Sequence, residues 1–171
     1  NKAKLEVKDS AFSNAEVGIL LDGSASANIF NTTFENSRGN SIQASQDGWK
    51  LNMEKSTITL GRGDMINISG KGEATLKENS FIGRVGNPND KSSHKAGGAD
   101  TAIHIISGPK ADIRSSEFIG LQNRGIDGNN SSVKITECLF SEINKFPLLF
   151  TTCYIEIENN DTESDNNKND D

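Results

Sequence analysis

Pairs of apolar residues separated by one residue recur along the chain, each pair 22 to 24 residues after the last except at one step of 37. The residue between the two is polar or charged, and such alternation is typical of a short strand with one buried face. No apolar stripe of helical period extends over ten residues, so the pattern predicts an all-β chain with almost no helix. The pairs are Leu5 and Val7, Ala27 and Ile29, Leu51 and Met53, Ala74 and Leu76, Ala111 and Ile113, Val133 and Ile135, and Ile155 and Ile157.

Two further apolar columns keep the same period. Because independent columns share one period, we expect a solenoid in which each repeat forms one rung. Each strand of a column is reached by a full circuit of the chain, so neighbouring strands must run parallel. An antiparallel sandwich of short strands is the alternative, but it does not explain the constant period. The first column is Phe12, Phe34, Ile58, Phe81, Phe118 and Phe140, and the second, the centre of another strand, is Ile19, Ile42, Ile66, Ile103, Ile126 and Leu148.

Small, mostly polar residues mark a corner after the first strand of each rung. A hydroxyl or amide there can bond its equivalents one rung above and below, which satisfies groups that strand pairing misses. Glycines that follow the later strand are expected to adopt the positive φ of a tight turn. These glycines are Gly23, Gly70, Gly108 and Gly128, and the corner residues are Ser10, Thr32, Ser56, Asn79, Ser116 and Cys138.

Rungs with a strand, a Ser/Thr/Asn corner, an inward Phe and a glycine exit resemble the right-handed parallel β-helix superfamily, the pectate-lyase-like fold. The resemblance covers residues 4–157. It implies a single-stranded right-handed parallel β-helix of about seven rungs with 22–24 residues each. The catalytic sequence motifs of polygalacturonases are absent, and so is a recognisable arginine-centred motif of pectate lyases. The resemblance therefore implies a fold and leaves open whether the chain is an enzyme.

The chain is expected to form one domain, a β-helix over residues 1–157 that is interrupted by an inserted loop at 84–100. About fourteen residues beyond the usual period lie there, and loops of this kind often carry function. Residues 158–171 hold six acidic residues and one lysine, and we expect this acidic tail to be disordered. The tail accounts for most of the net charge of −6, so the rest of the chain is close to neutral.

Composition removes several classes of function. No basic stripe is present, so nucleic-acid binding is not expected. No apolar run is long enough to cross a bilayer, and the chain begins with Asn1 without a signal peptide, as a mature chain or an excised segment would. Cys138 and Cys153 occupy different places in the repeat and are interpreted as free thiols. The turn from Asp127 to Ser132 lacks the spaced carboxylates of a Ca²⁺ loop, so neither a metal site nor a cofactor is predicted.

One outward column gathers different polar groups on consecutive rungs, namely Leu20, Gln43, Asn67, His104, Asp127 and Leu149. His104 and Asp127 are the candidate catalytic residues, because neighbouring rungs would allow a hydrogen bond that raises the histidine pKa. A lyase needs a base and a group that neutralises a uronic carboxylate, whereas a hydrolase needs two carboxylates. The candidate substrate-binding residues are Asn67, Arg124, Asp64, Asp100 and Arg84.

Two functional hypotheses follow. In the first, the chain is an extracellular or cell-surface module that binds or processes an extended polysaccharide, as a lyase or glycoside hydrolase if it is an enzyme. In the second, the chain is a structural or adhesive segment of a larger surface protein or fibre, and its uncapped ends are covered by further rungs or another subunit. Under the second hypothesis, the outward column that contains His104 and Asp127 is polar only because it is exposed to water.

Overall fold

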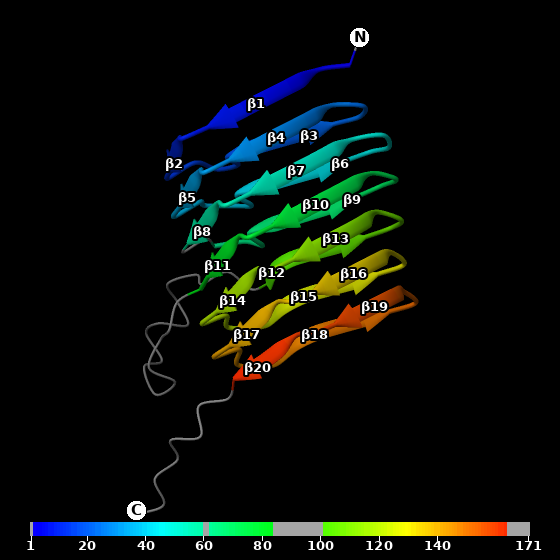
Figure 1. The fold of residues 1–171 in the computed structure, drawn as a ribbon. Helices are drawn as coiled ribbons and strands as arrows, with labels where there is room; N and C mark the ends of the chain where they lie inside the picture. The colour runs from blue at the N-terminus through cyan, green and yellow to red at the C-terminus, as the bar shows by residue number, and fades with distance from the viewer. Residues whose placement is uncertain (1, 60–61, 84–100, 164–171) are drawn as a thin grey trace, which may run out of the picture.

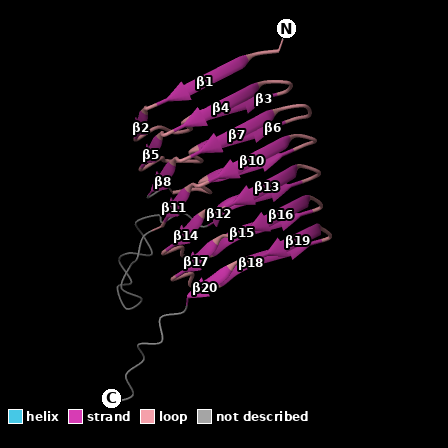
Figure 2. Cartoon of the chain, in the orientation of Figure 1, coloured by secondary structure: helices cyan, strands magenta, loops and turns pink. Residues whose placement is uncertain are grey.

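Short parallel strands wind into a coil, and no helix occurs among the residues that the structure describes (Figure 2). The structure is a computed structural model that describes residues 2–59, 62–83 and 101–163. Successive turns of the coil stack along one axis, from β1 at one end to β18, β19 and β20 at the other (Figure 1). The predicted all-β parallel solenoid is therefore confirmed. Within the described ranges no helix is long and apolar enough to span a membrane.

Three parallel sheets line the coil, and each complete rung contributes one strand to each sheet, while the last rung contributes β19 and β20 alone among the described residues. The first sheet has seven strands, β1 (Lys4–Lys8), β4 (Ser26–Phe30), β7 (Lys50–Glu54), β10 (Glu73–Lys77), β13 (Lys110–Arg114), β16 (Ser132–Thr136) and β19 (Tyr154–Glu158). The second sheet also has seven strands, β2 (Ala11–Ser13), β5 (Thr33–Glu35), β8 (Thr57–Thr59), β11 (Ser80–Ile82), β14 (Glu117–Ile119), β17 (Leu139–Ser141) and β20 (Asp161–Glu163). The third sheet has six strands, β3 (Ile19–Asp22), β6 (Ile42–Ser45), β9 (Ile66–Ser69), β12 (Thr101–Ile106), β15 (Arg124–Asn129) and β18 (Phe146–Thr151).

The second sheet was not expected as a separate sheet. Its strands have only three residues, so each shows a single inward position and no alternation along the sequence. The predicted columns are nevertheless in register in all three sheets, as Ile113 opposite Ile135 and Ile103 opposite Ile126 illustrate. Parallel pairing places equivalent residues opposite one another, and the shared period made that pairing predictable.

Stacked phenylalanine rings form much of the core beneath the second sheet. The ring centroids of Phe81 and Phe118 lie 4.9 Å apart, and those of Phe118 and Phe140 lie 4.7 Å apart with planes only 7° from parallel. All three side chains are buried. Each ring therefore contributes apolar burial and a stacking contact with its neighbours along the axis.

Large and small residues alternate where a column has to accommodate a bulky ring. Trp49 is fully buried, donates from Nε1 to the Ser69 carbonyl at 2.8 Å, and lies against Gly72, where a Cβ atom would overlap the indole. Gly128 was expected at a turn with positive φ, but it lies inside β15, where a Cβ would collide with the ring of Phe150. Space for the ring in the adjacent rung therefore explains Gly128.

The other predicted turn glycines have the expected conformation. Gly23, Gly70 and Gly108 have φ values of 59°, 80° and 108°. In the rung of Gly128 the turn is made instead by Asn130, whose φ is 49°. Asparagine tolerates this region better than most residues with a Cβ, which makes it a suitable substitute for glycine there.

Buried corner side chains connect the rungs as predicted. The Thr32 backbone N–H donates to Ser56 Oγ at 3.0 Å, the Ser56 N–H donates to Asn79 Oδ1 at 3.0 Å, and the Asn79 N–H donates to Ser116 Oγ at 3.2 Å. Where the corner residue is Ser or Thr, its hydroxyl also donates to the carbonyl two residues earlier, as Ser56 does to Glu54 at 2.9 Å. The corner column therefore replaces ladder hydrogen bonds where the chain leaves one sheet for the next.

The coil extends further than the sequence predicts. The acidic tail was expected to begin at residue 158, but β19 includes Glu158 and β20 pairs with β17. Asn160 makes this continuation possible, because its Oδ1 accepts from the Cys138 N–H at 2.7 Å and its Nδ2 donates to the Ile135 carbonyl at 3.0 Å. Backbone pairing and a corner amide need no apolar side chain. The amino-acid composition of this segment therefore did not predict that the coil continues through it. Residues 164–171 and the predicted loop at 84–100 lie outside the described residues.

The phenylalanine stack yields a stability prediction. We expect Phe118→Ala to lower the free energy of unfolding by about 3–5 kcal/mol, because it removes a buried ring that stacks on two others. Leu20→Ala is the matched control, since that side chain is 60% exposed and should cost less than about 0.5 kcal/mol. Chemical denaturation measures both, and equal losses would contradict the proposed core.

The corner column yields a second prediction. Asn79→Ala should cost about 1–3 kcal/mol, because it leaves the buried Ser56 N–H and the Met53 carbonyl without the partners they have now. Asn52→Ala removes an exposed amide that donates to Asn28 at 2.9 Å, so its effect should be within about 0.5 kcal/mol. Urea unfolding of both variants separates these expectations, and an Asn79→Ala variant as stable as the parent would disprove the corner's role.

Candidate functional site

Five of the predicted site residues lie together on the third sheet. Asn67, His104 and Asp127 are in register on β9, β12 and β15 and face away from the core. Asp64 lies just before β9, and Arg124 is the first residue of β15. We refer to these five residues as the His104 cluster. The other two predicted residues, Arg84 and Asp100, lie outside the described residues.

The imidazole of His104 lies between two carboxylates. Its Nδ1 is 3.1 Å from Asp64 Oδ2, which is a hydrogen bond, and its Nε2 is 3.9 Å from Asp127 Oδ2, which is too far for one. Sequence reasoning expected a hydrogen bond between His104 and Asp127, and that expectation is wrong. The closer partner, Asp64, lies in the turn before β9. The repeat period predicts which strand residues face outward, but it does not predict where a side chain in a turn points.

The rest of the cluster neutralises and orients these carboxylates. Asn67 Nδ2 donates to Asp64 Oδ2 at 3.0 Å, so one carboxylate oxygen serves both the amide and the imidazole. Arg124 forms an ion pair with Asp127 three residues along the same strand. Asp127 therefore has a cationic partner, whereas the described residues within ion-pairing distance of Asp64 include only His104.

Asp64 raises the pKa of His104. Its hydrogen bond with the ring is the largest cause, burial opposes it by disfavouring the charged ring, and the negative charges of Asp64 and Asp127 raise the pKa further. The positive charge of Arg124 lowers it. The predicted direction of the shift is thus confirmed, although Asp64 rather than Asp127 is its main cause.

The cluster is less exposed than an outward strand position suggests. The His104 side chain is 30% exposed, while those of Asp64 and Asp127 are 17% and 14% exposed. Nearby, the buried Arg124 Nε and Asn123 Oδ1 have no hydrogen-bond partner among the described residues. Buried polar groups without partners are uncommon in folded proteins. The cluster is thus a partly buried network, and removing Asp127 would leave the Arg124 guanidinium without its carboxylate.

The arrangement can exchange a proton and bind hydroxyl groups. Asp64 holds one ring nitrogen of His104, which leaves Nε2 as the nitrogen that could act toward a ligand. The carboxylates can accept hydrogen bonds from hydroxyls, and the amide of Asn67 can both donate and accept. Within the described ranges no group of three or more His, Cys, Asp or Glu residues is arranged to hold a metal ion.

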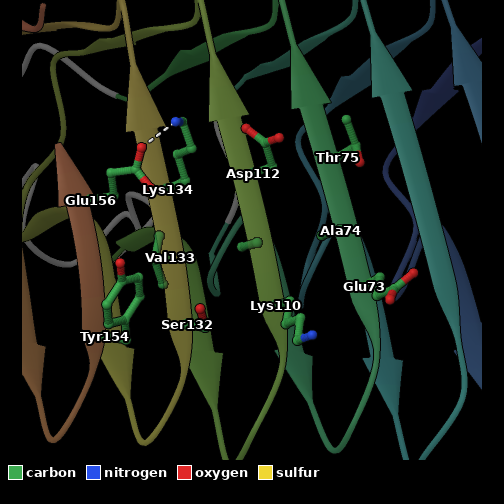
Figure 3. Close-up of a pocket in the computed structure, with 11 residues that line it drawn as sticks. Glu73, Ala74, Thr75, Lys110, Asp112, Ser132, Val133, Lys134, Tyr154 and Glu156 are labelled. Atoms are coloured by element: carbon green, nitrogen blue, oxygen red, sulfur yellow. Dashed lines mark hydrogen bonds and ion pairs between the residues drawn. The ribbon is translucent and has the colours of Figure 1, made fainter. Parts of the chain in front are cut away.

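Sequence reasoning missed a second surface feature. A hollow of about 260 Å³ lies over the outer face of the first sheet, between β10 and β19 (Figure 3). Only the third-sheet column was singled out from the sequence, because it carries different polar groups on consecutive rungs and the predicted loop directly precedes one of its strands in the sequence. A hollow depends on the relative sizes of side chains in several columns, which no single column reveals. Its lining includes Glu73, Thr75, Lys110, Asp112, Ser132, Lys134, Tyr154 and Glu156.

The geometry yields a prediction about proton binding. The pKa of the His104 ring, followed by NMR in a His94→Ala background, should lie above that of an ordinary histidine and fall in Asp64→Asn, which loses the main cause of the shift. Asp22→Asn is the control on the same sheet, where the carboxylate accepts a hydrogen bond from Ser45 at 3.2 Å and none from a histidine among the described residues. An unchanged His104 pKa in Asp64→Asn would refute the assignment.

The same shift has a consequence for stability. A raised pKa means that folding favours the protonated ring. The contribution of the protonated His104 ring to the stability of the fold is therefore complete below the pKa of the unfolded histidine. This contribution is lost as the pH rises through the folded-state pKa. We expect the stability difference between the parent and His104→Gln to shrink across that pH range, as measured by unfolding at several pH values.

A comparison with known protein families agrees with this architecture. The family described as “Right handed beta helix region” matches residues 1–162. A search of curated protein sequences finds no significant match. The matched residues take in the three parallel sheets through β19 and most of β20, so the family and the coil describe the same part of the chain. The chain belongs to the right-handed β-helix family.

Proposed function

We propose that this chain is an extracellular or cell-surface module that binds an extended polysaccharide along its third sheet. The supporting observation is the His104 cluster, in which an imidazole, an amide, a guanidinium and one carboxylate lie on three neighbouring parallel strands and a second carboxylate lies in the turn before the first of them. Rungs of a parallel sheet lie about 4.8 Å apart, so a chain ligand that runs along the axis would meet a new set of side chains at each rung.

The chemistry of the cluster suits sugar hydroxyls. Asp64 and Asp127 offer acceptors, and Asn67 offers both a donor and an acceptor. Arg124 brings a guanidinium that can bind carboxylate oxygens, the group that distinguishes a uronic sugar. His104 lies between the two aspartates and is partly exposed, so a ligand on this face would contact the ring.

If the module is a lyase, we infer that His104 is the acid–base group. In a lyase reaction, the base takes the proton beside the uronate carboxylate, the bond to the leaving glycosidic oxygen breaks, and a double bond forms in the sugar. The leaving oxygen takes up a proton from the protonated base or from water and departs as a hydroxyl group. Asp64 would orient the ring for this step, and Arg124 would lie near the substrate carboxylate. In a hydrolase reaction, Asp64 and Asp127 would be the two carboxylates that the mechanism requires.

A second candidate function, a structural or adhesive segment, has its own supporting observation. Ile155 and Ile157 belong to an inward column, yet both are exposed on β19. Leu5, in the first strand of the same sheet, is exposed as well. Further rungs or another subunit that stacked on these strands would cover the side chains and pair the free strand edges.

Two assays together separate the candidates. A glycan array tests binding, and an absorbance assay for unsaturated uronic products tests lyase chemistry. We expect binding to at least one extended polysaccharide. No binding and no product would favour the structural function.

Site variants test where binding occurs. His104→Ala and Asp127→Asn should each weaken polysaccharide binding about tenfold or more, the effect of losing a hydrogen bond to a charged group. Asparagine replaces aspartate at position 127 because it retains an acceptor for the partly buried Arg124. Asn28→Ala on the first sheet is the control. If neither variant binds more weakly than this control, the third-sheet site is wrong.

A further inference from the structure

The hollow on the first sheet contains two hydroxyl groups without a hydrogen-bond partner and one lysine without an ion pair among the residues that the structure describes. It lies over β10, β13, β16 and β19, and we call it the first-sheet trough (Figure 3). Ser132 lies between Lys110 and Tyr154 in one outward row, opposite both of them in register. Because serine is much shorter than lysine or tyrosine, the row has a low point at Ser132 with a longer side chain on each side.

Charges in the second row of the trough are already paired. Asp112 forms an ion pair with Arg114, and Lys134 forms one with Glu156. At the edge of the trough, Glu73 is 3.0 Å from Lys50. An anion that entered the trough would therefore meet carboxylates whose charge is largely compensated.

Lys110, by contrast, forms no ion pair with a described residue, although its charge acts on Glu73, which lies opposite it in register and is itself ion-paired with Lys50. The Ser132 hydroxyl and the Tyr154 phenol likewise have no hydrogen-bond partner within the described ranges, and Tyr154 is 70% exposed. A cation with no ion pair of its own, a hydroxyl and an aromatic face thus adjoin one hollow. This combination can bind an anion, a hydroxyl and an apolar ring face at the same time.

The trough continues beyond Lys110 into an apolar notch of about 420 Å³. Both hollows share Glu73 and Lys110, so they adjoin. Glycines 48, 72 and 108 line the notch, and the absence of their side chains opens the surface beside the buried Trp49. Lys71, on the rim, makes no ion pair with a described residue either. A ligand longer than one unit could therefore extend from Tyr154 past Lys110 into this notch.

We propose that the first-sheet trough is a binding site for an acidic sugar unit of a glycan. The sugar ring packs on Tyr154, its carboxylate binds Lys110, and a ring hydroxyl bonds Ser132. The site lies on a different sheet from the His104 cluster and shares no residue with it. It therefore stands independently of the proposed polysaccharide site, and either one can fail without the other.

Isothermal titration and NMR with matched sugars test the proposal. The probes are sialyllactose and glucuronic acid, each with one carboxylate, and the neutral comparison sugars are lactose and glucose. We expect at least one acidic probe to bind more tightly than its neutral counterpart, and its affinity to fall as salt is added, because the lysine contact is solvent-exposed. If neither acidic probe binds, or if lactose and glucose bind equally well, the proposal is overturned.

Variants locate the binding. Lys110→Gln and Tyr154→Ala should each weaken binding of the acidic probe about tenfold, the effect of losing a charged contact or a stacking face. Tyr154→Phe retains the ring and should change affinity by no more than about threefold, since one exposed hydroxyl contributes little. Lys8→Gln, on the far end of the same sheet, is the charge control.

The outcomes separate this site from the third-sheet site. Binding lost in Lys110→Gln and Tyr154→Ala but retained in His104→Ala supports the trough. Binding retained in the first two variants and lost only in His104→Ala overturns it. Circular dichroism of each variant checks that the coil is intact, as expected for substitutions of exposed or half-buried side chains.

Discussion

Parallel pairing of each strand with its equivalent one rung away is the constraint on which the rest of the structure depends. Strands about 4.8 Å apart place every side chain directly against the residue at the same position in the next rung. Apolar positions therefore become continuous stacks, as with the Phe81, Phe118 and Phe140 rings. The same contact imposes size complementarity between rungs, which is why glycine lies beside Trp49 and Phe150.

The corners show what this pairing requires where strands end. The residue before each corner side chain adopts positive φ, including Lys55 at 51° and Glu137 at 55°, neither of which favours that region. Such conformations cost about 1 kcal/mol or more each, so they persist only where surrounding contacts enforce them. The enforcing contacts are the hydrogen bonds of the buried corner column, such as the one from the Ser56 N–H to Asn79.

Outside the core, the same repetition turns single residues into surfaces. On the third sheet it brings together groups that bind each other, so His104, Asp64 and Asn67 form a network with a raised histidine pKa. On the first sheet, several lysines form ion pairs with glutamates of the next rung, whereas Lys110 forms no ion pair and Tyr154 no hydrogen bond with a described residue. The third sheet therefore carries a cluster of polar side chains that bind one another, whereas the first sheet carries an open trough.

The sequence by itself determined which residues share a column, because the period of 22 to 24 residues requires only that equivalent positions stack. This was enough to predict the three inward columns, the corner bonds and the grouping of Asn67, His104 and Asp127. Tertiary structure alone decided that Asp64 rather than Asp127 accepts from His104, that Gly128 makes room for Phe150, and that a trough opens at Ser132. The physical reason is that a period specifies neighbours along the axis, whereas these features depend on side-chain direction and size across different columns and turns.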